Sequence, residues 1–379
     1  MDEDKSGILS YWNMKASGKD TRPFQITEFP LYSDSRITGE IRNTGNSYEF
    51  LNLVPFDNSS RLANESIMVR MSWFVDGEGT YGVKTDHSKY HGGWVTDELA
   101  ALSSLRLGVR FKAGSVVRVF GGHCTDDLGC PNAARNEIPE VRFGYGKPIL
   151  PSVVKQVSIE KLQTINELQV LKSQQFVALV RSARQYQKSL WVAETEPELA
   201  WLMLVSALET AANEWQAQEL SSVEMMKIAK PDLSESILAQ GNEKLLETIS
   251  TEIAPTLKAT AKFMKFCINF MPEPPEKRPT EYAQVNWSKS NLKKILNIIY
   301  KYRSIALHAG TPFPTPLCRP PDVTNKAEVV SEKGCLGLAA HTMGGSWKSE
   351  DLPMTMNTFS YFVNEVLNSW WDSMVQQEV

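Results

Sequence analysis

The stretch "ELAWLMLVSALETAANEW", from Glu198 to Trp215, carries apolar side chains on every face of its first helical turns. A helix that is hydrophobic all round lies in the interior of a bundle rather than on its surface. Glu209 is the only acid between Glu198 and Glu214. Because an isolated buried carboxylate is costly, we expect Glu209 to have a partner or to be neutral.

Helical periodicity extends to both sides of this central helix. The predicted helices cover residues 157–190, 197–218, 235–271, 289–307 and 355–373. Between the last two lies a long Pro-rich insert at about 309–354. Connections of that length are usually functional or disordered.

The pattern differs before about Phe143, where short apolar runs alternate with Gly, Asn, Asp and Ser and predict β-strands. These runs are "YEFLNLVPF" (48–56), "IMVRMSWFV" (67–75) and "SVVRVF" (115–120). One helix is expected among them, in "TDELAALSSLRLG", with Thr96 as its N-cap, acids in its first turn and an end at Gly108.

The chain has 379 residues, which favours two domains over one. The Pro- and Gly-bearing connector "GYGKPILPS" lies between the two patterns. The sequence therefore predicts an α+β protein with a β-rich domain at 1–145, a linker at 146–156 and an all-α helical bundle at 157–379. The first domain has no assigned role, and a sensor or regulatory role is one possibility.

Composition excludes several classes of protein. The chain is 42% hydrophobic and 22% charged, as in globular proteins, and no run reaches the roughly 18 apolar residues of a membrane span. The acidic start "MDEDKSGILSYWNMK" lacks a secretory signal pattern, so we expect no membrane and a cytoplasmic location. Five scattered cysteines favour free thiols over a disulfide framework.

Two glycine- or cysteine-bearing motifs partly match known ligand-binding patterns. "GEGTYG" (77–82) has the glycine spacing of a dinucleotide loop, but no amphipathic helix follows it, so a hairpin turn is the better interpretation. "HCTDDLGC" (123–130) lacks the paired spacing of a zinc site and is interpreted as a polar loop. We expect no cofactor and no metal.

The predicted helix at 289–307 places Arg303 near the centre of its apolar stripe, so the arginine points inward. It is either a structural partner of Glu209 or a phosphate ligand in a cleft. His308 projects about 140° away from Arg303 if the helix continues that far. The two can share a site only if the helix ends near Leu307, or if two subunits each contribute.

A segment of 40 residues around this pair, Tyr282 to Pro321, contains no Asp or Glu. Its six basic residues are Lys289, Lys293, Lys294, Lys301, Arg303 and Arg319. Such a segment in a chain of net charge −4 indicates a phosphate-bearing partner, and RNA is the candidate. Four aromatic residues could stack on unpaired bases or pack in the core: Trp287, Tyr300, Tyr302 and Phe313.

The helical half resembles the HEPN superfamily, and most closely its ApeA-like branch, which is found in bacteria. The resemblance rests on the Arg-x4-6-His pattern formed by Arg303, Ser304 and His308, on "ALE" at 207–209 and on the Pro-rich insert after "HAG". It covers about 157–379, with a weaker similarity before that. Many members carry Asn, Asp or His where this chain has Ser304.

The resemblance implies a metal-independent endoribonuclease that acts on single-stranded or tRNA-like RNA as a homodimer or higher homo-oligomer. It also implies a toxin-like or anti-phage role, with a phage-derived or regulatory trigger. His308 would be the general acid and base, Arg303 would stabilise the phosphoryl charge, and Ser304 would orient the substrate by hydrogen bonding. Lys293, Lys294 and Lys301 would bind the RNA backbone. The alternative is a non-catalytic module that binds nucleotide or RNA, or that dimerises, with Arg303 fixed in an ion pair.

Overall fold

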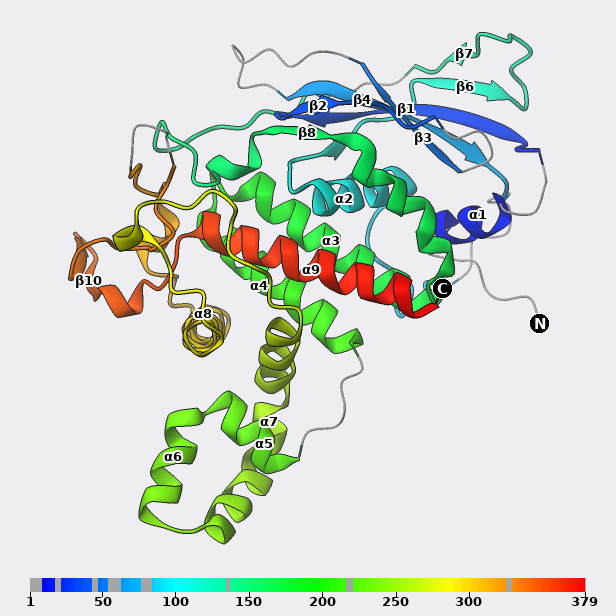
Figure 1. Ribbon diagram of the computed structural model, residues 1–379. Coiled ribbons are helices and arrows are strands. Elements are labelled where there is room, and N and C mark those ends of the chain that lie inside the picture. The colour runs from blue at the N-terminus through cyan, green and yellow to red at the C-terminus, as the bar shows by residue number, and fades with distance from the viewer. Residues whose placement is uncertain are drawn as a thin grey trace. The chain divides into compact units, whose positions relative to one another are not determined.

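The computed structural model describes residues 9–17, 22–42, 47–53, 63–75, 84–133, 137–215, 221–324 and 329–378 (Figure 1). The chain divides into two compact units. The first comprises Met1–Glu196 with Trp370–Val379, and the second comprises Pro197–Ser369. The division therefore falls further along the chain than the segment 146–156, and residues 157–196 belong with the β-rich unit.

The first unit is built on a six-stranded antiparallel sheet in the order β3-β4-β1-β6-β7, with a short β5 also paired to β1. The strands are β1 (Gln25–Ser33), β3 (Tyr48–Asn52), β4 (Asn64–Trp73), β5 (Lys112–Ala113), β6 (Arg118–Gly121) and β7 (Cys130–Pro131). The three apolar runs of the sequence supply β3, β4 and β6, which confirms a β-rich N-terminal region. Residues 54–62 lie outside the described part.

Helices of the first unit lie beneath one face of this sheet in Figure 1. They are α1 (Leu9–Ser17), α2 (Val95–Leu107), the 3₁₀ helix η2 (Ile159–Val170) and α3 (Ser173–Val192). A short parallel pair, β2 (Arg36–Thr38) with β8 (Gln156–Ser158), and the turn η1 (Pro151–Val153) complete the unit.

The continuous helix expected at 157–190 is wrong. Residues 156–158 form a strand, and η2 follows before α3 begins. The cause is visible in the spacing of the buried residues Ile159, Leu162, Ile165 and Leu168, each of which is fully buried. They recur every third residue, which is the period of a 3₁₀ helix rather than the 3.6 of an α-helix.

Helix α2 ends at Gly108 as expected, with this glycine in the left-handed conformation at φ 62°. Its start differs from the expectation. The N-cap is Trp94 rather than Thr96, and the Asp97 carboxylate accepts a hydrogen bond from the Trp94 backbone N–H at 3.0 Å. The acid in the first turn thus satisfies a backbone donor directly.

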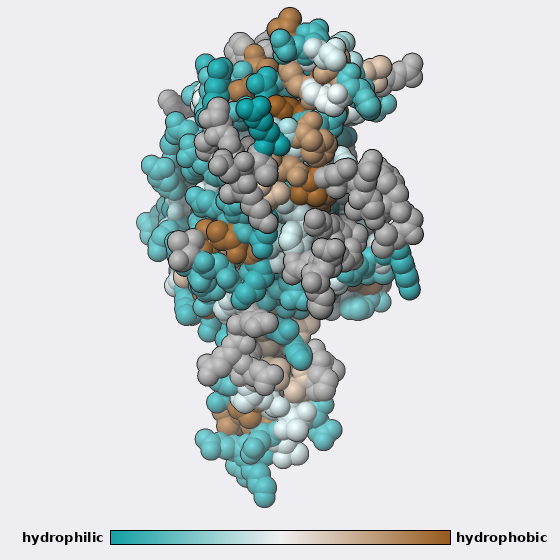
Figure 2. All heavy atoms as spheres, turned by 90° about the vertical axis from the view of Figure 1, so that its right-hand side faces the viewer, coloured by the Kyte–Doolittle hydropathy of each residue, from teal (hydrophilic) through white to brown (hydrophobic). Residues whose placement is uncertain are grey.

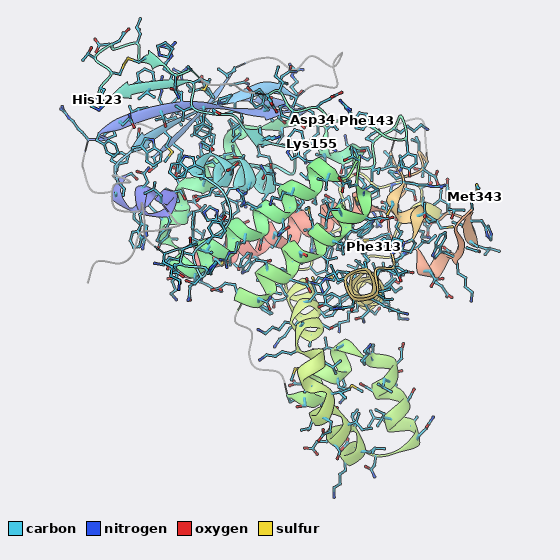
Figure 3. The ribbon with its side chains drawn as sticks, turned by 180° about the vertical axis from the view of Figure 1, so that it is seen from behind. Asp34, His123, Phe143, Lys155, Phe313 and Met343 are labelled. Atoms are coloured by element: carbon cyan, nitrogen blue, oxygen red, sulfur yellow. A yellow bond between two sulfur atoms is a disulfide. The ribbon has the colours of Figure 1, made fainter. Side chains whose placement is uncertain are left out.

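A buried ionic network holds the first unit together. The Arg110 guanidinium is fully buried and donates to Asp34 at 2.7 Å and to Glu194 at 2.9 Å. Glu194 also accepts from the backbone N–H of Ile149 at 2.7 Å. Asp34 follows β1 and is labelled in Figure 3, so this network joins the end of β1 to the end of α3.

The loop between β6 and β7 corrects the expectation of free thiols only, because Cys124 and Cys130 form a disulfide. Cys267, Cys318 and Cys335 are free. The disulfide closes the "HCTDDLGC" loop, and no group of His, Cys, Asp or Glu suited to a metal ion occurs among the described residues. The "GEGTYG" motif lies outside the described residues.

The second unit is mostly helical. Its main helices are α4 (Pro197–Glu214), α7 (Glu243–Asn269), α8 (Lys289–Ala309) and the greater part of α9 (Met356–Glu378). The central helix α4 is buried as expected: its Trp201 is fully buried, stacks on Phe313 and Phe359, and donates its indole N–H to the Leu317 carbonyl at 3.0 Å.

The helix expected at 235–271 is interrupted. The chain forms α5 (Ser222–Ala229), α6 (Pro231–Gln240) and then α7, because Gly241 ends α6 and the Asn242 side chain caps α7. A small apolar cluster that includes Met226 and Leu246 joins α5 to α7.

In Figure 2, hydrophobic patches on the visible face are small and separated.

The Pro-rich insert corrects the expectation of an all-α second domain. It contains the turns η4 (Thr315–Cys318) and η5 (Ser349–Asp351) and an antiparallel hairpin of β9 (Ala339–Thr342) and β10 (Gly345–Lys348). Met343, at the hairpin tip, is fully exposed and labelled in Figure 3.

No helix in the described part of the chain is both long and apolar enough to cross a membrane.

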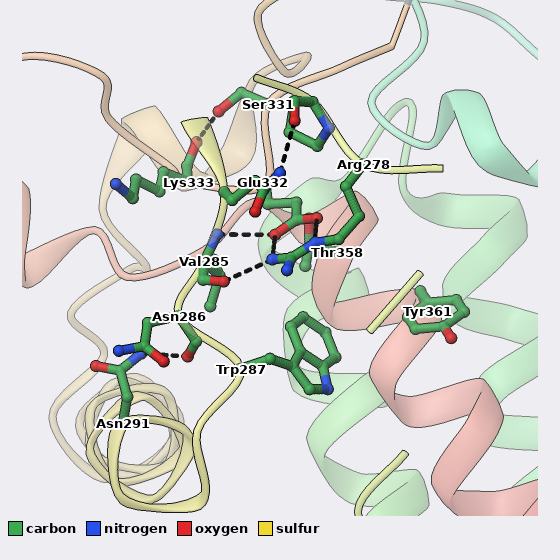
Figure 4. A network of polar contacts seen from close by, with 12 residues as sticks. Arg278, Val285, Asn286, Trp287, Asn291, Ser331, Glu332, Lys333, Thr358 and Tyr361 are labelled. Atoms are coloured by element: carbon green, nitrogen blue, oxygen red, sulfur yellow. Dashed lines mark hydrogen bonds and ion pairs between the residues drawn. The ribbon is translucent and has the colours of Figure 1, made fainter. Parts of the chain in front are cut away.

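A buried ion pair anchors this insert (Figure 4). The Glu332 carboxylate accepts hydrogen bonds from both Nε and Nη2 of Arg278, at 2.7 and 2.6 Å, and from the Val285 backbone N–H at 2.7 Å. Arg278 and Val285 lie on either side of the turn η3 (Glu281–Ala283), just before α8. The insert is therefore fixed to the segment that leads into α8.

Candidate functional site

Helix α8 carries every residue of the Arg-x4-His pattern. Its buried side is apolar, with Leu292, Leu296 and Ile299 almost or fully inaccessible. The helix continues through His308 to Ala309 and ends at Gly310, which adopts the left-handed conformation at φ 67°. The expected end near Leu307 is therefore wrong, since the left-handed glycine sets the boundary.

Because Arg303 and His308 both lie in regular helix, their side chains leave α8 about 140° apart. Arg303 is partly buried, whereas His308 is exposed in the last turn. Within one chain the structure thus does not bring the arginine and the histidine together. The Ser304 side chain lies between them in direction and is partly exposed, and its hydroxyl forms no hydrogen bond to a described residue.

Arg303 forms an ion pair with Glu209 of α4. Its Nη2 donates to Glu209 Oε2 at 2.5 Å, and the two side chains are 19% and 16% exposed. The other carboxylate oxygen, Oε1, accepts a hydrogen bond from the Tyr300 hydroxyl at 2.9 Å. Glu209, the lone acid of the central helix, therefore has its partner on α8.

Tyr300 is held tightly in this site. It is 8% exposed, its ring centroid lies 4.7 Å from that of Phe263, and its hydroxyl also bonds the Thr260 side chain. Burial, followed by the nearby Glu209 carboxylate, raises the pKa of Tyr300 to about 12. The phenol consequently stays protonated and continues to donate its hydrogen.

The exposed side of α8 is basic. Lys293, Lys294, Lys301 and His308 are all exposed and lie within an arc of about 100° around the helix axis. None of the four forms an ion pair with a described residue. The three lysine charges are therefore available to an external anion, unlike the charge of Arg303, and the His308 imidazole lies beside them.

The four aromatic residues near the pair serve packing. Phe313 is 2% exposed against Trp201, and Tyr300 is buried beside Phe263. The Tyr302 hydroxyl donates to the Asp351 carbonyl at 2.9 Å. The Trp287 indole donates to the Pro272 carbonyl at 2.8 Å. Of the two interpretations of these rings, base stacking and core packing, the structure favours packing.

Sequence reasoning missed Tyr300 and Thr260 as polar partners in this site. Tyr300 precedes Arg303 by three residues, a spacing that puts both on one side of a helix. That spacing could have identified Tyr300. Thr260 has no comparable signal, because its contact depends on how α7 packs against α8.

The first unit contains a second buried polar cluster. Glu98 of α2 contacts the Ser10 hydroxyl of α1 through one carboxylate oxygen and His91 Nε2 at 2.6 Å through the other. Both Glu98 and His91 have side chains that are only 3% exposed. Burial raises the pKa of Glu98, and the His91 hydrogen bond opposes that shift. This cluster joins α1 to α2.

Comparison with protein-family models, with curated proteins and with solved structures gives no match to this chain. The assignment of the site therefore depends on the geometry described above.

Proposed function

We propose that the helical unit binds RNA along the exposed basic side of α8, and that two copies together cleave the RNA in the manner of a HEPN ribonuclease. The observation that carries the proposal is the row of unpaired basic side chains that ends in His308, in a segment without acids. The resemblance of the Arg-x4-His pattern supplies the reaction type.

The row suits a phosphate backbone. From Lys293 to His308 it extends about 22 Å along the helix axis, at about 1.5 Å per residue. Lysines that are not already neutralised by acids release counterions when they contact phosphates, which favours binding. His308 lies in the last turn of α8, at the end of this row.

The proposed reaction needs no metal. A base removes the proton of the 2′-hydroxyl, and the 2′-oxygen attacks the neighbouring phosphorus. The bond from phosphorus to the 5′-oxygen breaks, and an acid gives that oxygen a proton, leaving a 2′,3′-cyclic phosphate and a 5′-hydroxyl. An imidazole such as that of His308 can fill both proton roles near neutral pH, and a guanidinium can stabilise the phosphoryl charge.

A second copy of the chain is part of the proposal. Since Arg303 and His308 diverge within one helix, one copy would supply the histidine and its partner the arginine to the same phosphate. A two-fold axis near α8 would create two such sites. In this role the first, β-rich unit would restrain or trigger the second.

A second candidate function is RNA binding without cleavage. The observation that favours it is the ion pair between Arg303 and Glu209, which already occupies the guanidinium. In this case α8 would still bind phosphates through its lysines, while Arg303 would only stabilise the packing of α8 on α4.

The test is RNA binding and cleavage in the presence of EDTA by the full chain and by three variants: Lys293→Ala/Lys301→Ala, His308→Ala and the control Lys227→Ala/Lys258→Ala. The control removes two exposed lysines of the same unit. We expect the first variant to bind RNA at least tenfold more weakly, the second to bind but not cleave, and the control to match the wild type. Equal binding by the first variant and the control would remove the RNA proposal. Intact binding without any wild-type cleavage would favour the second candidate.

A further inference from the structure

The contact between Arg303 and Glu209 is one hydrogen bond, although both side chains can form two. A guanidinium presents Nε and Nη2 as a side-on fork, and a carboxylate can fill that fork with both oxygens. Here Oε2 contacts Nη2, whereas Nε is buried and has no hydrogen-bond partner. The pair is therefore held through a single carboxylate oxygen.

Tyr300 explains the unfilled position. Its hydroxyl donates to Oε1, the oxygen that would otherwise reach Nε. The phenol cannot easily move away, because Thr260 bonds the same hydroxyl and Phe263 packs against the ring. One oxygen of the Glu209 carboxylate thus contacts Tyr300, and the other contacts Arg303.

The remaining end of the guanidinium is open. The Arg303 side chain keeps 19% of its surface exposed. Its Nη1 forms no hydrogen bond with a described residue and, unlike Nε, is not fully buried. An external anion can therefore approach Nη1 without rearrangement of α8. If Glu209 releases Nη2, it keeps its bond to Tyr300.

We propose that Tyr300 is a positioning residue that prevents Glu209 from chelating Arg303, so that a phosphodiester of RNA can replace Glu209 on the guanidinium. This inference rests on the proposed function and identifies the ligand of Arg303. Glu209 then acts as an internal competitor of the phosphate. A bidentate carboxylate would compete more strongly than the one-oxygen contact does.

The test is the affinity for a single-stranded RNA as a function of salt concentration. For single strands, each phosphate contact contributes about 0.7 to the slope of log affinity against log salt. Tyr300→Phe frees Oε1 for Nε, so we expect weaker binding and a slope smaller by about 0.7. Glu209→Gln can still accept from Arg303 through its amide oxygen and can donate its amide N–H to the Tyr300 hydroxyl, but it removes the competing charge, so we expect binding up to about fivefold tighter.

Combination variants and a matched control make the result specific. Tyr300→Phe/Glu209→Gln should recover the wild-type slope, because a neutral amide does not compete. Arg303→Ala should reduce the slope of log affinity against log salt by the same amount. Adding Tyr300→Phe to Arg303→Ala should then have no further effect. Tyr302→Phe is the control, since it removes a partly buried phenol of the same helix whose hydroxyl bonds the Asp351 carbonyl instead. Its slope should equal that of the wild type.

Failure of this inference can be told apart from failure of the proposed function. If Tyr300→Phe and Glu209→Gln both weaken binding without a change of slope, Arg303 is only structural and the inference is wrong. The RNA proposal would still stand if the Lys293→Ala/Lys301→Ala variant binds poorly. If the lysine variant also binds normally, the proposed function fails. Should Arg303→Ala unfold, the opposite effects expected of the two milder variants decide the question.

Discussion

Arg278 and Glu332 are 54 residues apart in the chain, and they form a two-pronged ion pair that fixes the Pro-rich insert beside the start of α8. The Glu332 side chain is 4% exposed, whereas the Arg278 side chain is 22% exposed. The pair therefore connects a long loop to the helix that carries the candidate site.

Glu332→Ala should destabilise the helical unit by about 3 kcal/mol, since it leaves the Arg278 guanidinium partly buried without its partner. Thermal or urea unfolding of the full chain measures this. Glu350→Ala is the matched control, because Glu350 pairs with Lys348 at a surface where both side chains are at least 75% exposed. The control should change stability by well under 1 kcal/mol, and a similar effect of both variants would contradict the prediction.

The tyrosines of the helical unit predict a loss of stability at alkaline pH. Burial raises the pKa of Tyr300, Tyr302 and Tyr361 to about 12, whereas a tyrosine of the unfolded chain has its ordinary pKa of 10.0. Between these values the unfolded chain loses protons that the folded chain keeps, so the unfolding free energy decreases as pH rises. Urea unfolding at a series of alkaline pH values tests this, and Tyr300→Phe should flatten the decrease.

The cluster around Glu98 predicts a pH dependence of the first unit. Burial raises the pKa of Glu98, so the folded chain holds this proton more tightly than the unfolded chain. Its contribution to stability is greatest below the ordinary glutamate pKa of 4.5 and is lost as pH rises through the raised pKa of the folded chain.

Glu98→Gln should remove this dependence. The unfolding free energy of the variant should therefore increase relative to that of the wild type as pH rises. Urea unfolding of both proteins from acidic to neutral pH provides the comparison. A difference in unfolding free energy that is constant across the range would contradict the prediction. His91, Arg184 and Asp97 also influence the pKa of Glu98. These three residues are the same in both proteins, so the difference between the two pH profiles reports the loss of the Glu98 carboxyl group.

Reduction of the disulfide between Cys124 and Cys130 should weaken only the first unit. The closed loop is short, with a sequence separation of 6, and loop closure of that size is worth about 2 kcal/mol. Cys124→Ser/Cys130→Ser should therefore lower stability by at most about 2 kcal/mol and leave RNA affinity unchanged. A loss of RNA binding after reduction would tie this loop to the function of α8.

Expression in a bacterial host tests the biological side of the proposal. A toxin-like ribonuclease should slow growth and fragment cellular RNA, and His308→Ala should abolish both effects at an equal protein level. Immunoblotting controls the level, and electrophoresis of total RNA over time reports cleavage. Growth arrest with intact RNA, or arrest by the His308→Ala variant, would exclude RNA cleavage as the cause.

The buried helix α4 and the inward direction of Arg303 could be predicted because both follow from the 3.6-residue period. The sequence offers Glu209 as one of two candidate partners of Arg303, a phosphate being the other, because this carboxylate is the lone acid of an apolar helix; the structure pairs the two residues. The sequence predicts the end of α8 two residues early, because proline and glycine after a helix indicate only the vicinity of its boundary. The left-handed Gly310 fixes the end at Ala309.

Other features depend on contacts that no local pattern encodes. The hairpin of β9 and β10 contains glycines and small residues and lacks the long apolar alternation of a typical strand. The disulfide depends on the fold of the β6–β7 loop, which brings the Cα atoms of Cys124 and Cys130 within 5.8 Å. The one-oxygen contact of Glu209 depends on Thr260 and Phe263, which come from a third helix.

The period of three in η2 makes a prediction about insertions and deletions. Ile159, Leu162, Ile165 and Leu168 lie in one row, so adding or removing three residues keeps every later side chain on the same side. Such a change alters the length of the element by about 6 Å, at about 2.0 Å per residue. Adding one residue turns the rest of the row by about 120° and exposes it. Among homologous chains, length differences within this segment should therefore occur in multiples of three.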